Sequence, residues 1–158
     1  MTRKTYSQLA AEAAAQVTEI MPWDVANFLA ENSGALLLDI RERAEFDALH
    51  IAGSVNVPRG ILESAAEWDY PETEPALVTA RDKPVAIICR SGNRSAMAAM
   101  VLAQVGFSNV CSVKLGIRGW NDSDLELVDS AGNTLDSDDA EALIDPPIRA
   151  DQINPERR

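Results

Sequence analysis

The segment Val85-Ala86-Ile87-Ile88-Cys89-Arg90-Ser91-Gly92-Asn93-Arg94-Ser95 indicates both the architecture of this chain and its chemistry. Its first residues are apolar and are typical of a buried strand that ends at Cys89. A polar loop follows, and then the alanine- and methionine-rich run 96–103, which predicts a helix that begins near Arg94 or Ser95. Because the chain turns between strand and helix, we expect backbone N–H groups and the positive end of the helix dipole to face the Cys89 sulfur.

This setting favours a reactive thiolate at Cys89. Helix N-termini and nearby cations stabilise a thiolate over a thiol, and Arg90 and Arg94 add positive charge where their side chains face the site. A buried, inert strand-end cysteine is the common structural alternative. Gly92 and Arg94 are in register with the helix start, which favours a nucleophile or an anion carried on sulfur.

The segment 89–95 resembles the active-site loop of rhodanese-type sulfurtransferases. Two further regions carry the same resemblance. The first is an Asp-x-Arg-x-x-x-Glu-Phe pattern at 39–46, followed by a His-Ile-x-Gly-x-x-Asn-Val-Pro pattern at 50–58 in which Ser54 replaces the family's usual alanine. The second is the Gly-x-x-x-Trp turn at 116–120, which is typical of the end of a rhodanese domain.

Strands that alternate with helices predict an α/β protein with a parallel sheet. The resemblance implies a rhodanese-like fold over residues 19–121, with a five-stranded parallel sheet flanked by helices on both faces. Residues 1–18 are expected to form an N-terminal accessory helix, capped by Thr5 or Ser7.

Residues 122–158 form an acidic C-terminal extension. The sequence predicts a small hairpin around 130–133, a helix that Ser137 caps and that runs through Ile144, and an extended or disordered end. We expect a solvated acidic tail here.

The resemblance places the chemistry in one loop. Cys89 is the implied nucleophile, and Arg94 is expected to brace its own loop by donating to carbonyl groups while its charge favours the thiolate. For Arg90, contact with an anionic donor and pairing with an acidic neighbour both stay open. The residues expected to bind substrate are Arg90, Ser91, Gly92, Asn93, Ser95 and, at the mouth of the pocket, Arg59.

Four residues that suggest chemistry are expected to be structural instead. Asp39 and Arg41 are expected to form an ion pair that fixes the first loop. His50 is expected to be a turn histidine whose hydrogen bonds are made within the fold, rather than a general base. Cys111 lies in an apolar strand and is expected to be inert core, with a role as resolving partner of Cys89 left open.

The implied function is that of a thiosulfate sulfurtransferase-like enzyme without a metal or organic cofactor. A persulfide on Cys89 would carry sulfur from an anionic donor such as thiosulfate to a thiol or cyanide acceptor. A Cys-dependent phosphatase or arsenate reductase is a weaker alternative, because tyrosine phosphatases place five residues between cysteine and arginine whereas four separate Cys89 from Arg94 here. Those phosphatases also place a histidine where this chain has Ile88.

A persulfide carrier or a protein-binding rhodanese module is a further alternative. A protein sulfur acceptor, or a second subunit in a homodimer, would then dock on the N-terminal helix or the acidic extension.

Composition narrows the class of partner. The chain has 158 residues and a formal net charge of −11, which argues against binding to a nucleic-acid backbone. It has two cysteines and one histidine, too few and wrongly spaced for a zinc site or a disulfide scaffold. No secretory h-region and no membrane-length apolar run is present. The sequence therefore predicts a cytoplasmic protein without a nucleic-acid or membrane partner.

Overall fold

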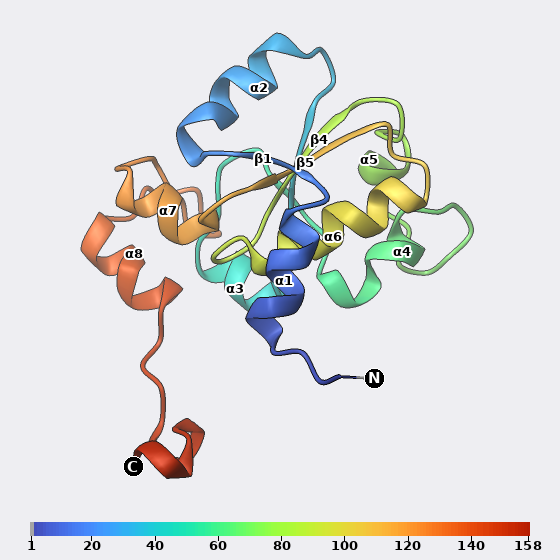
Figure 1. Ribbon diagram of the computed structural model, residues 1–158. Coiled ribbons are helices and arrows are strands. Elements are labelled where there is room, and N and C mark those ends of the chain that lie inside the picture. Colours follow the sequence, from blue (N-terminus) through green and yellow to red (C-terminus); the bar gives the residue numbers. More distant parts are fainter. Residues whose placement is uncertain (1) are drawn as a thin grey trace.

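The computed structural model describes residues 2–158 and is built around a five-stranded sheet (Figure 1). The strand order is β1-β5-β4-β2-β3, and all neighbouring strands are parallel. The expected α/β fold, with a five-stranded parallel sheet and helices on both faces, is confirmed. The strands are β1 (Thr18–Ile20), β2 (Leu36–Asp39), β3 (Val55–Asn56), β4 (Pro84–Ile88) and β5 (Asn109–Val113).

Strand β4 lies at the centre of the sheet because its residues suit a strand covered on both faces. Residues 85–88 are apolar and fully buried, as is typical of the middle of a parallel sheet. In the register with β2, Ile88 lies beside Asp39. Cys89 and the residues after Asp39 therefore leave the sheet at the same edge, where the carboxyl ends of the strands meet.

Helices cover both faces of the sheet, and α1 packs on α6 (Figure 1). The α-helices are α1 (Tyr6–Ala14), α2 (Val25–Glu31), α3 (Arg43–Ala48), α4 (Leu62–Ala65), α5 (Pro75–Val78), α6 (Asn93–Gln104), α7 (Gly116–Asp122) and α8 (Ser137–Ile144). Short 3-10 helices are η1 (Pro22–Asp24), η2 (Arg59–Ile61), η3 (Ala150–Gln152) and η4 (Pro155–Arg157).

The first face of the sheet packs against α4, α5 and α6. Leu38 and Ile87 from the sheet meet Leu62 of α4, Leu77 of α5 and Leu102 of α6 in one buried cluster. The same cluster contains Cys89. The alanine-rich character of α6 lets it lie close to the sheet, since short side chains fill little space.

The second face packs against α2, α7 and α8, and here the C-terminal extension completes the core. Leu127, Ala140 and Ile144 belong to the same buried cluster as Cys111 and Trp120. The expectation of a solvated acidic tail is therefore wrong up to Ile144, because apolar residues between the acidic ones bury against the sheet. The domain boundaries at 19 and 122 stay a prediction.

Two of the expected helix starts can be compared with the structure. The predicted N-terminal helix is present, and Thr5 caps it: the Thr5 hydroxyl accepts from the Gln8 N–H at 3.1 Å, and the Gln8 side chain accepts from the Thr5 N–H at 2.8 Å. Helix α8 begins as predicted, but its cap is Asp136, whose carboxylate accepts from the Asp138 N–H at 2.9 Å. The expected cap, Ser137, is the first helical residue instead.

The extension before α8 turns back on itself as expected. Val128 bridges antiparallel to both Thr134 and His50, so the turn is tied to the body of the protein as well as to itself. Among residues 2–158 no helix combines the length and the apolar character needed to cross a bilayer.

Candidate active site

The loop between β4 and α6 wraps around the Cys89 sulfur. The side chain is almost fully buried, with 1% of its surface exposed. Its Sγ atom accepts hydrogen bonds from the backbone N–H of Gly92 at 3.2 Å and of Ser95 at 3.3 Å. Ser95 is the third residue of α6, and the first N–H groups of a helix have no partner within the helix. The sulfur therefore takes the place of a helix-capping oxygen and lies at the positive end of the helix dipole.

Gly92 gives the loop the shape that this arrangement requires. Its φ angle is +97°, in the left-handed region that favours glycine. A Cβ atom there would also lie 3.2 Å from the backbone nitrogen of Leu115. Both the turn and the close approach of the next loop therefore require glycine at this position.

Two buried hydroxyl groups lie behind the sulfur. The Cys89 thiol donates to the Ser95 hydroxyl over 3.4 Å, and the Ser95 hydroxyl is 2.8 Å from that of Ser112 in β5. Both serines are fully buried. The Ser95 hydroxyl also donates to the Gly92 carbonyl at 3.2 Å. Because a hydroxyl rotates to donate or to accept, Ser95 can turn its proton from that carbonyl toward a thiolate while Ser112 donates to Ser95. Sequence reasoning missed Ser112, because a serine in an apolar strand gives no signal of its register with the next strand.

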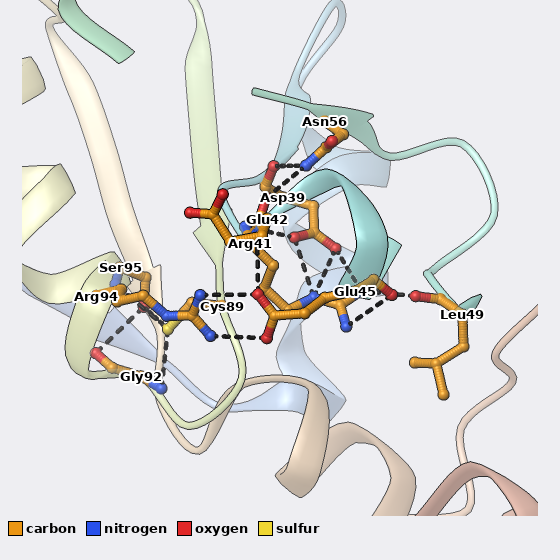
Figure 2. Close-up of polar contacts among 10 residues, drawn as sticks. All are labelled: Asp39, Arg41, Glu42, Glu45, Leu49, Asn56, Cys89, Gly92, Arg94 and Ser95. Atoms are coloured by element: carbon orange, nitrogen blue, oxygen red, sulfur yellow. Dashed lines mark hydrogen bonds and ion pairs between the residues drawn. The ribbon is translucent and has the colours of Figure 1, made fainter. Parts of the chain in front are cut away.

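Arg94 is held by Glu45 of α3 rather than by its own loop (Figure 2). The two side chains form a bidentate pair, with Nη1–Oε2 at 3.0 Å and Nη2–Oε1 at 3.1 Å. The expectation that Arg94 braces the loop through its carbonyl groups is therefore wrong about the partner. Glu45 was also missed as a site residue, although it is the glutamate of the Asp-x-Arg-x-x-x-Glu-Phe pattern.

This pairing shifts both groups toward their charged forms. Burial opposes the charge on Glu45, but the hydrogen bonds from Arg94 and from the Glu42 N–H, together with the charges of Arg94 and Arg41, lower the pKa of Glu45 below its ordinary 4.5. The hydrogen bond to Glu45 raises the pKa of Arg94. Because Glu45 offsets much of the charge of Arg94, negative charge on the Cys89 sulfur would be stabilised chiefly by the backbone N–H groups and the helix dipole.

A second ion pair, between Arg41 and Asp39, also holds α3 in place (Figure 2). The Arg41 guanidinium lies against the Asp39 carboxylate at 2.9 Å, donates to the Leu49 carbonyl at 2.7 Å, and also reaches the Glu45 carbonyl. Asp39 and Arg41 are both buried. The predicted structural ion pair is confirmed, and it fixes the segment that carries Glu45.

Helix α7 closes the back of the loop. The N–H groups of Ile117 and Arg118 donate to the carbonyls of Cys89 at 2.8 Å and of Arg90 at 3.0 Å. A Cβ atom at Gly116 would collide with the backbone of Cys89 and Arg90, so only glycine fits there. The carbonyl groups of Cys89 and Arg90 thus bond to α7, while two N–H groups of the loop point inward to the sulfur.

The other predicted substrate-binding residues lie around this centre. Ser91, Gly92 and Asn93 line a hollow of about 460 Å³ between the loop and α1. Arg90 is exposed to solvent beside Cys89. Arg59 lies in η2, beyond β3, and no hydrogen bond or ion pair of its side chain to the loop is present among residues 2–158. Its place at the mouth of the pocket stays a prediction.

His50 and Cys111 are structural, as expected. The His50 Nδ1 atom lies 2.8 Å from the Phe46 carbonyl, and its ring stacks on that of Phe46 with 3.9 Å between the centroids. Cys111 belongs to the buried cluster on the opposite face of the sheet from Cys89.

Comparison with known proteins agrees with this geometry. The sequence profile of the rhodanese-like domain family matches residues 23–123. The chain is 37% identical over 84 residues to "Putative sulfur carrier protein YrkF" of Bacillus subtilis, a match that spans 53% of this chain but 40% of that protein. The chain therefore spans less than half of this curated relative.

Solved structures have the same fold. The human single-domain sulfurtransferase TSTD1 is 25% identical with a TM-score of 0.54, covering 67% of this chain and 95% of that one. A protein of unknown function from Rhodopseudomonas palustris, described as a possible tyrosine phosphatase, is 26% identical with a TM-score of 0.67, covering 78% and 94%. Because the family profile matches residues 23–123, more than half of the chain, this chain belongs to the rhodanese-like domain family.

Proposed function

We propose that this chain is a sulfurtransferase that moves a sulfane sulfur from an anionic, thiosulfate-like donor to a thiol or cyanide acceptor through a persulfide on Cys89. The observation that carries the proposal is the pair of backbone N–H groups, from Gly92 and Ser95, that point at the Cys89 sulfur. Fixed donors of this kind stabilise negative charge on a reacting atom without reorganising during the reaction.

In the first step the Cys89 thiolate attacks the outer sulfur of thiosulfate. A new S–S bond forms to Cys89, the S–S bond of thiosulfate breaks, and sulfite leaves with the electron pair. In the second step an acceptor such as cyanide attacks the outer sulfur of the persulfide. The bond to Cys89 breaks, thiocyanate leaves, and Cys89 recovers its thiolate.

The buried hydroxyl pair supports this cycle. In the thiol form Ser95 accepts from Cys89, and in the thiolate form it can donate to the sulfur, with Ser112 as its own donor. The sulfur therefore keeps hydrogen-bond partners in each state.

The mass of the intact protein tests the proposal. Thiosulfate should add one sulfur atom to the parent protein and to Cys111→Ser, and cyanide should remove it, whereas Cys89→Ser should stay unmodified. A folded protein with a free Cys89 thiol that gains no sulfur overturns the proposal. Hydrolysis of p-nitrophenyl phosphate by that same protein, lost in Cys89→Ser, would establish phosphatase chemistry in its place.

A persulfide carrier is the second candidate, and it is favoured by the description of YrkF as a putative sulfur carrier. The two differ in turnover. An enzyme releases many equivalents of thiocyanate per protein with excess thiosulfate and cyanide, whereas a carrier loads once and is unloaded by a protein acceptor.

A further inference from the structure

Ser112 is a polar residue in the apolar interior of the protein. It lies between Cys111 and Val113 in β5 and points to the face of the sheet that α6 covers, where its hydroxyl oxygen is 2.8 Å from that of Ser95. Both serines are fully buried. A buried hydroxyl costs free energy unless it is hydrogen bonded, and alanine would fill nearly the same space without this cost. Packing therefore gives no reason for a serine here, whereas the hydrogen bond to Ser95 does.

The hydroxyl of Ser112 has one hydrogen-bond partner within residues 2–158, and that partner is the Ser95 hydroxyl. The proton of Ser112 is therefore directed at the Ser95 oxygen whenever Ser95 turns its own proton elsewhere. Ser95 has two other acceptors in reach, the Gly92 carbonyl at 3.2 Å and the Cys89 sulfur at 3.4 Å (Figure 2). The direction of the Ser95 proton thus depends on the state of the sulfur.

In the thiol state the Ser95 hydroxyl has its partners without help from Ser112. The Cys89 thiol donates to the Ser95 oxygen, and Ser95 donates to the Gly92 carbonyl. If the Ser112 hydroxyl were removed, the Ser95 oxygen would still accept from the thiol.

In the thiolate state Ser112 becomes necessary. The sulfur has no proton to give, so Ser95 turns its own proton to the sulfur, and the Ser95 oxygen then accepts from Ser112 alone. Without Ser112 this oxygen would be a buried acceptor with no donor, which costs free energy. The persulfide has the same requirement, because the Cys89 sulfur is bonded to a second sulfur and again carries no proton. The Ser112 hydroxyl therefore stabilises these two states more than it stabilises the thiol.

We infer that Ser112 is a positioning residue for the nucleophile: it donates to Ser95, directs the Ser95 proton to the Cys89 sulfur, and so favours the thiolate and the persulfide over the thiol. The part that concerns the persulfide rests on the proposed sulfur transfer. Each hydroxyl keeps its own proton and only rotates, and the proton of the thiol is released to water. Ser112 acts through Ser95.

The ionisable groups around the sulfur stay the same when Ser112 is replaced. Arg94 faces Cys89 from α6 while it is paired with Glu45 of α3. The other ionisable side chains near the loop are Arg90 on the loop itself, the buried pair of Asp39 and Arg41, Tyr6 of α1 near Arg94, Lys114 after β5, and Glu19, which lies opposite Ser112 in the register of β1 with β5. In the part of the chain that the structure describes, none of them hydrogen bonds to Ser95 or Ser112. A change in the ionisation of Cys89 on loss of the Ser112 hydroxyl would therefore report on that hydroxyl.

The test is a pH titration of the Cys89 thiolate, followed by its ultraviolet absorbance. The absorbance is the difference between each protein and the same protein with Cys89→Ser, so that the contributions of Cys111 and the tyrosines cancel. Ser112→Ala should move the midpoint to higher pH and lower the thiolate fraction below the midpoint by about fivefold, the effect of one hydrogen bond of typical strength. Ser112→Thr retains the hydroxyl and should keep the parent midpoint.

Ser54→Ala is the matched control. It removes a hydroxyl whose one hydrogen bond within the described residues is to the Ile51 carbonyl, at 2.6 Å, so it should lose stability and keep the parent midpoint. Thermal unfolding establishes that each variant is folded. An unchanged midpoint in Ser112→Ala, or an equal shift in folded Ser112→Thr or in Ser54→Ala, overturns the inference.

Sulfur loading from thiosulfate separates this inference from the proposed function. If both hold, Ser112→Ala gains sulfur about fivefold more slowly than the parent below the parent's midpoint, and at the parent's rate above its own midpoint. If the midpoint moves in Ser112→Ala but neither protein gains sulfur, the role of Ser112 toward the thiolate stands and the proposed function fails. If the parent gains sulfur and the midpoint does not move, Ser112 has no such role and the proposed function stands.

Discussion

Cys89 directly follows β4, and Cys111 lies in the neighbouring strand β5. Both are almost fully buried, with 1% and 2% of their surface exposed. Both belong to apolar clusters. Their surroundings differ. Cys89 also receives two backbone N–H groups, from Gly92 and Ser95, whereas burial raises the pKa of the Cys111 thiol to about 11. Burial by itself therefore makes a cysteine inert. Donors that arrive together with burial prepare it to carry negative charge.

The sheet also keeps the two sulfurs apart. Cys111 pairs with Ala86 on β4, three residues before Cys89. Because side chains alternate between the faces of a strand, the two cysteines belong to core clusters on opposite faces. A disulfide between them would require the sheet to open, so the role of Cys111 as a resolving partner is excluded while the fold is intact.

The largest effect on sulfur transfer is expected from replacing the cysteines with serine, one at a time. Cys89→Ser should lower sulfur transfer by at least about a thousandfold, because the nucleophile is lost. Cys111→Ser should retain transfer within about twofold, with lower stability from the added polar group. Thiocyanate release and thermal unfolding measure the two quantities. Loss of transfer in Cys111→Ser with its fold intact would show that Cys111 is not inert.

Distorting the loop between β4 and α6 should have the next largest effect on sulfur transfer. Gly92→Ala forces a Cβ onto a left-handed backbone and against Leu115, so we expect roughly a hundredfold slower transfer from the misplaced N–H groups and about 1–2 kcal/mol lower stability. Gly132→Ala is the control. Gly132 has a φ of +85° but open space around its Cβ position, so it should lose stability alone. Equal rates in the two variants would show that the loop shape does not matter to the chemistry.

Breaking the pair between Glu45 and Arg94 should have a smaller effect. Glu45→Gln should lower stability by about 1–2 kcal/mol at neutral pH, because Arg94 loses a charged partner. The folded protein lowers the pKa of Glu45 below 4.5, so this stabilisation is complete above that value and is lost as the pH falls through the folded pKa.

The difference in unfolding free energy between Glu45→Gln and the parent should thus shrink in acid. Glu63→Gln, at an exposed glutamate of α4, serves as the control. A difference that stays constant with pH would contradict this account of the ion pair.

The smallest effect concerns Cys111 at high pH. An unfolded chain loses the proton of this thiol near pH 9, while the folded protein holds it until about 11. The unfolded state then binds fewer protons, so stability falls as the pH rises through this interval. The double variant Cys89→Ser/Cys111→Val should lose less stability between about pH 8 and about pH 10 than the single variant Cys89→Ser. Parallel losses in both proteins would show that Cys111 titrates freely.

The sequence alone predicted the parts of the site that are local in the chain. The apolar run before Cys89 and the alanine-rich run after the loop locate a strand, a turn and a helix within a few residues of one another. Thr5 and its helix were found in the same way. The local sequence pattern is enough to locate a structural element when the residues that form it follow one another in the chain.

The missed parts are contacts between distant segments. Glu45 and Arg94 are 49 residues apart, and Ser112 reaches Ser95 only because α6 packs on β5. The acidic composition of the extension hid Leu127 and Ile144, which are buried. Composition averages over a segment, whereas packing depends on single side chains at particular spacings.

The sulfur of Cys89 is held by main-chain N–H groups, which every amino acid except proline possesses. Substitution of the outward side chains of Ser91 and Asn93 therefore leaves those two donors unchanged. Under the proposed function, the donors that stabilise the sulfur and the side chains that would meet a substrate are different atoms of one short loop. A loop built in this way would tolerate single mutations of its outward side chains without losing the donors to the sulfur, and this tolerance is a property of the backbone rather than of any one residue.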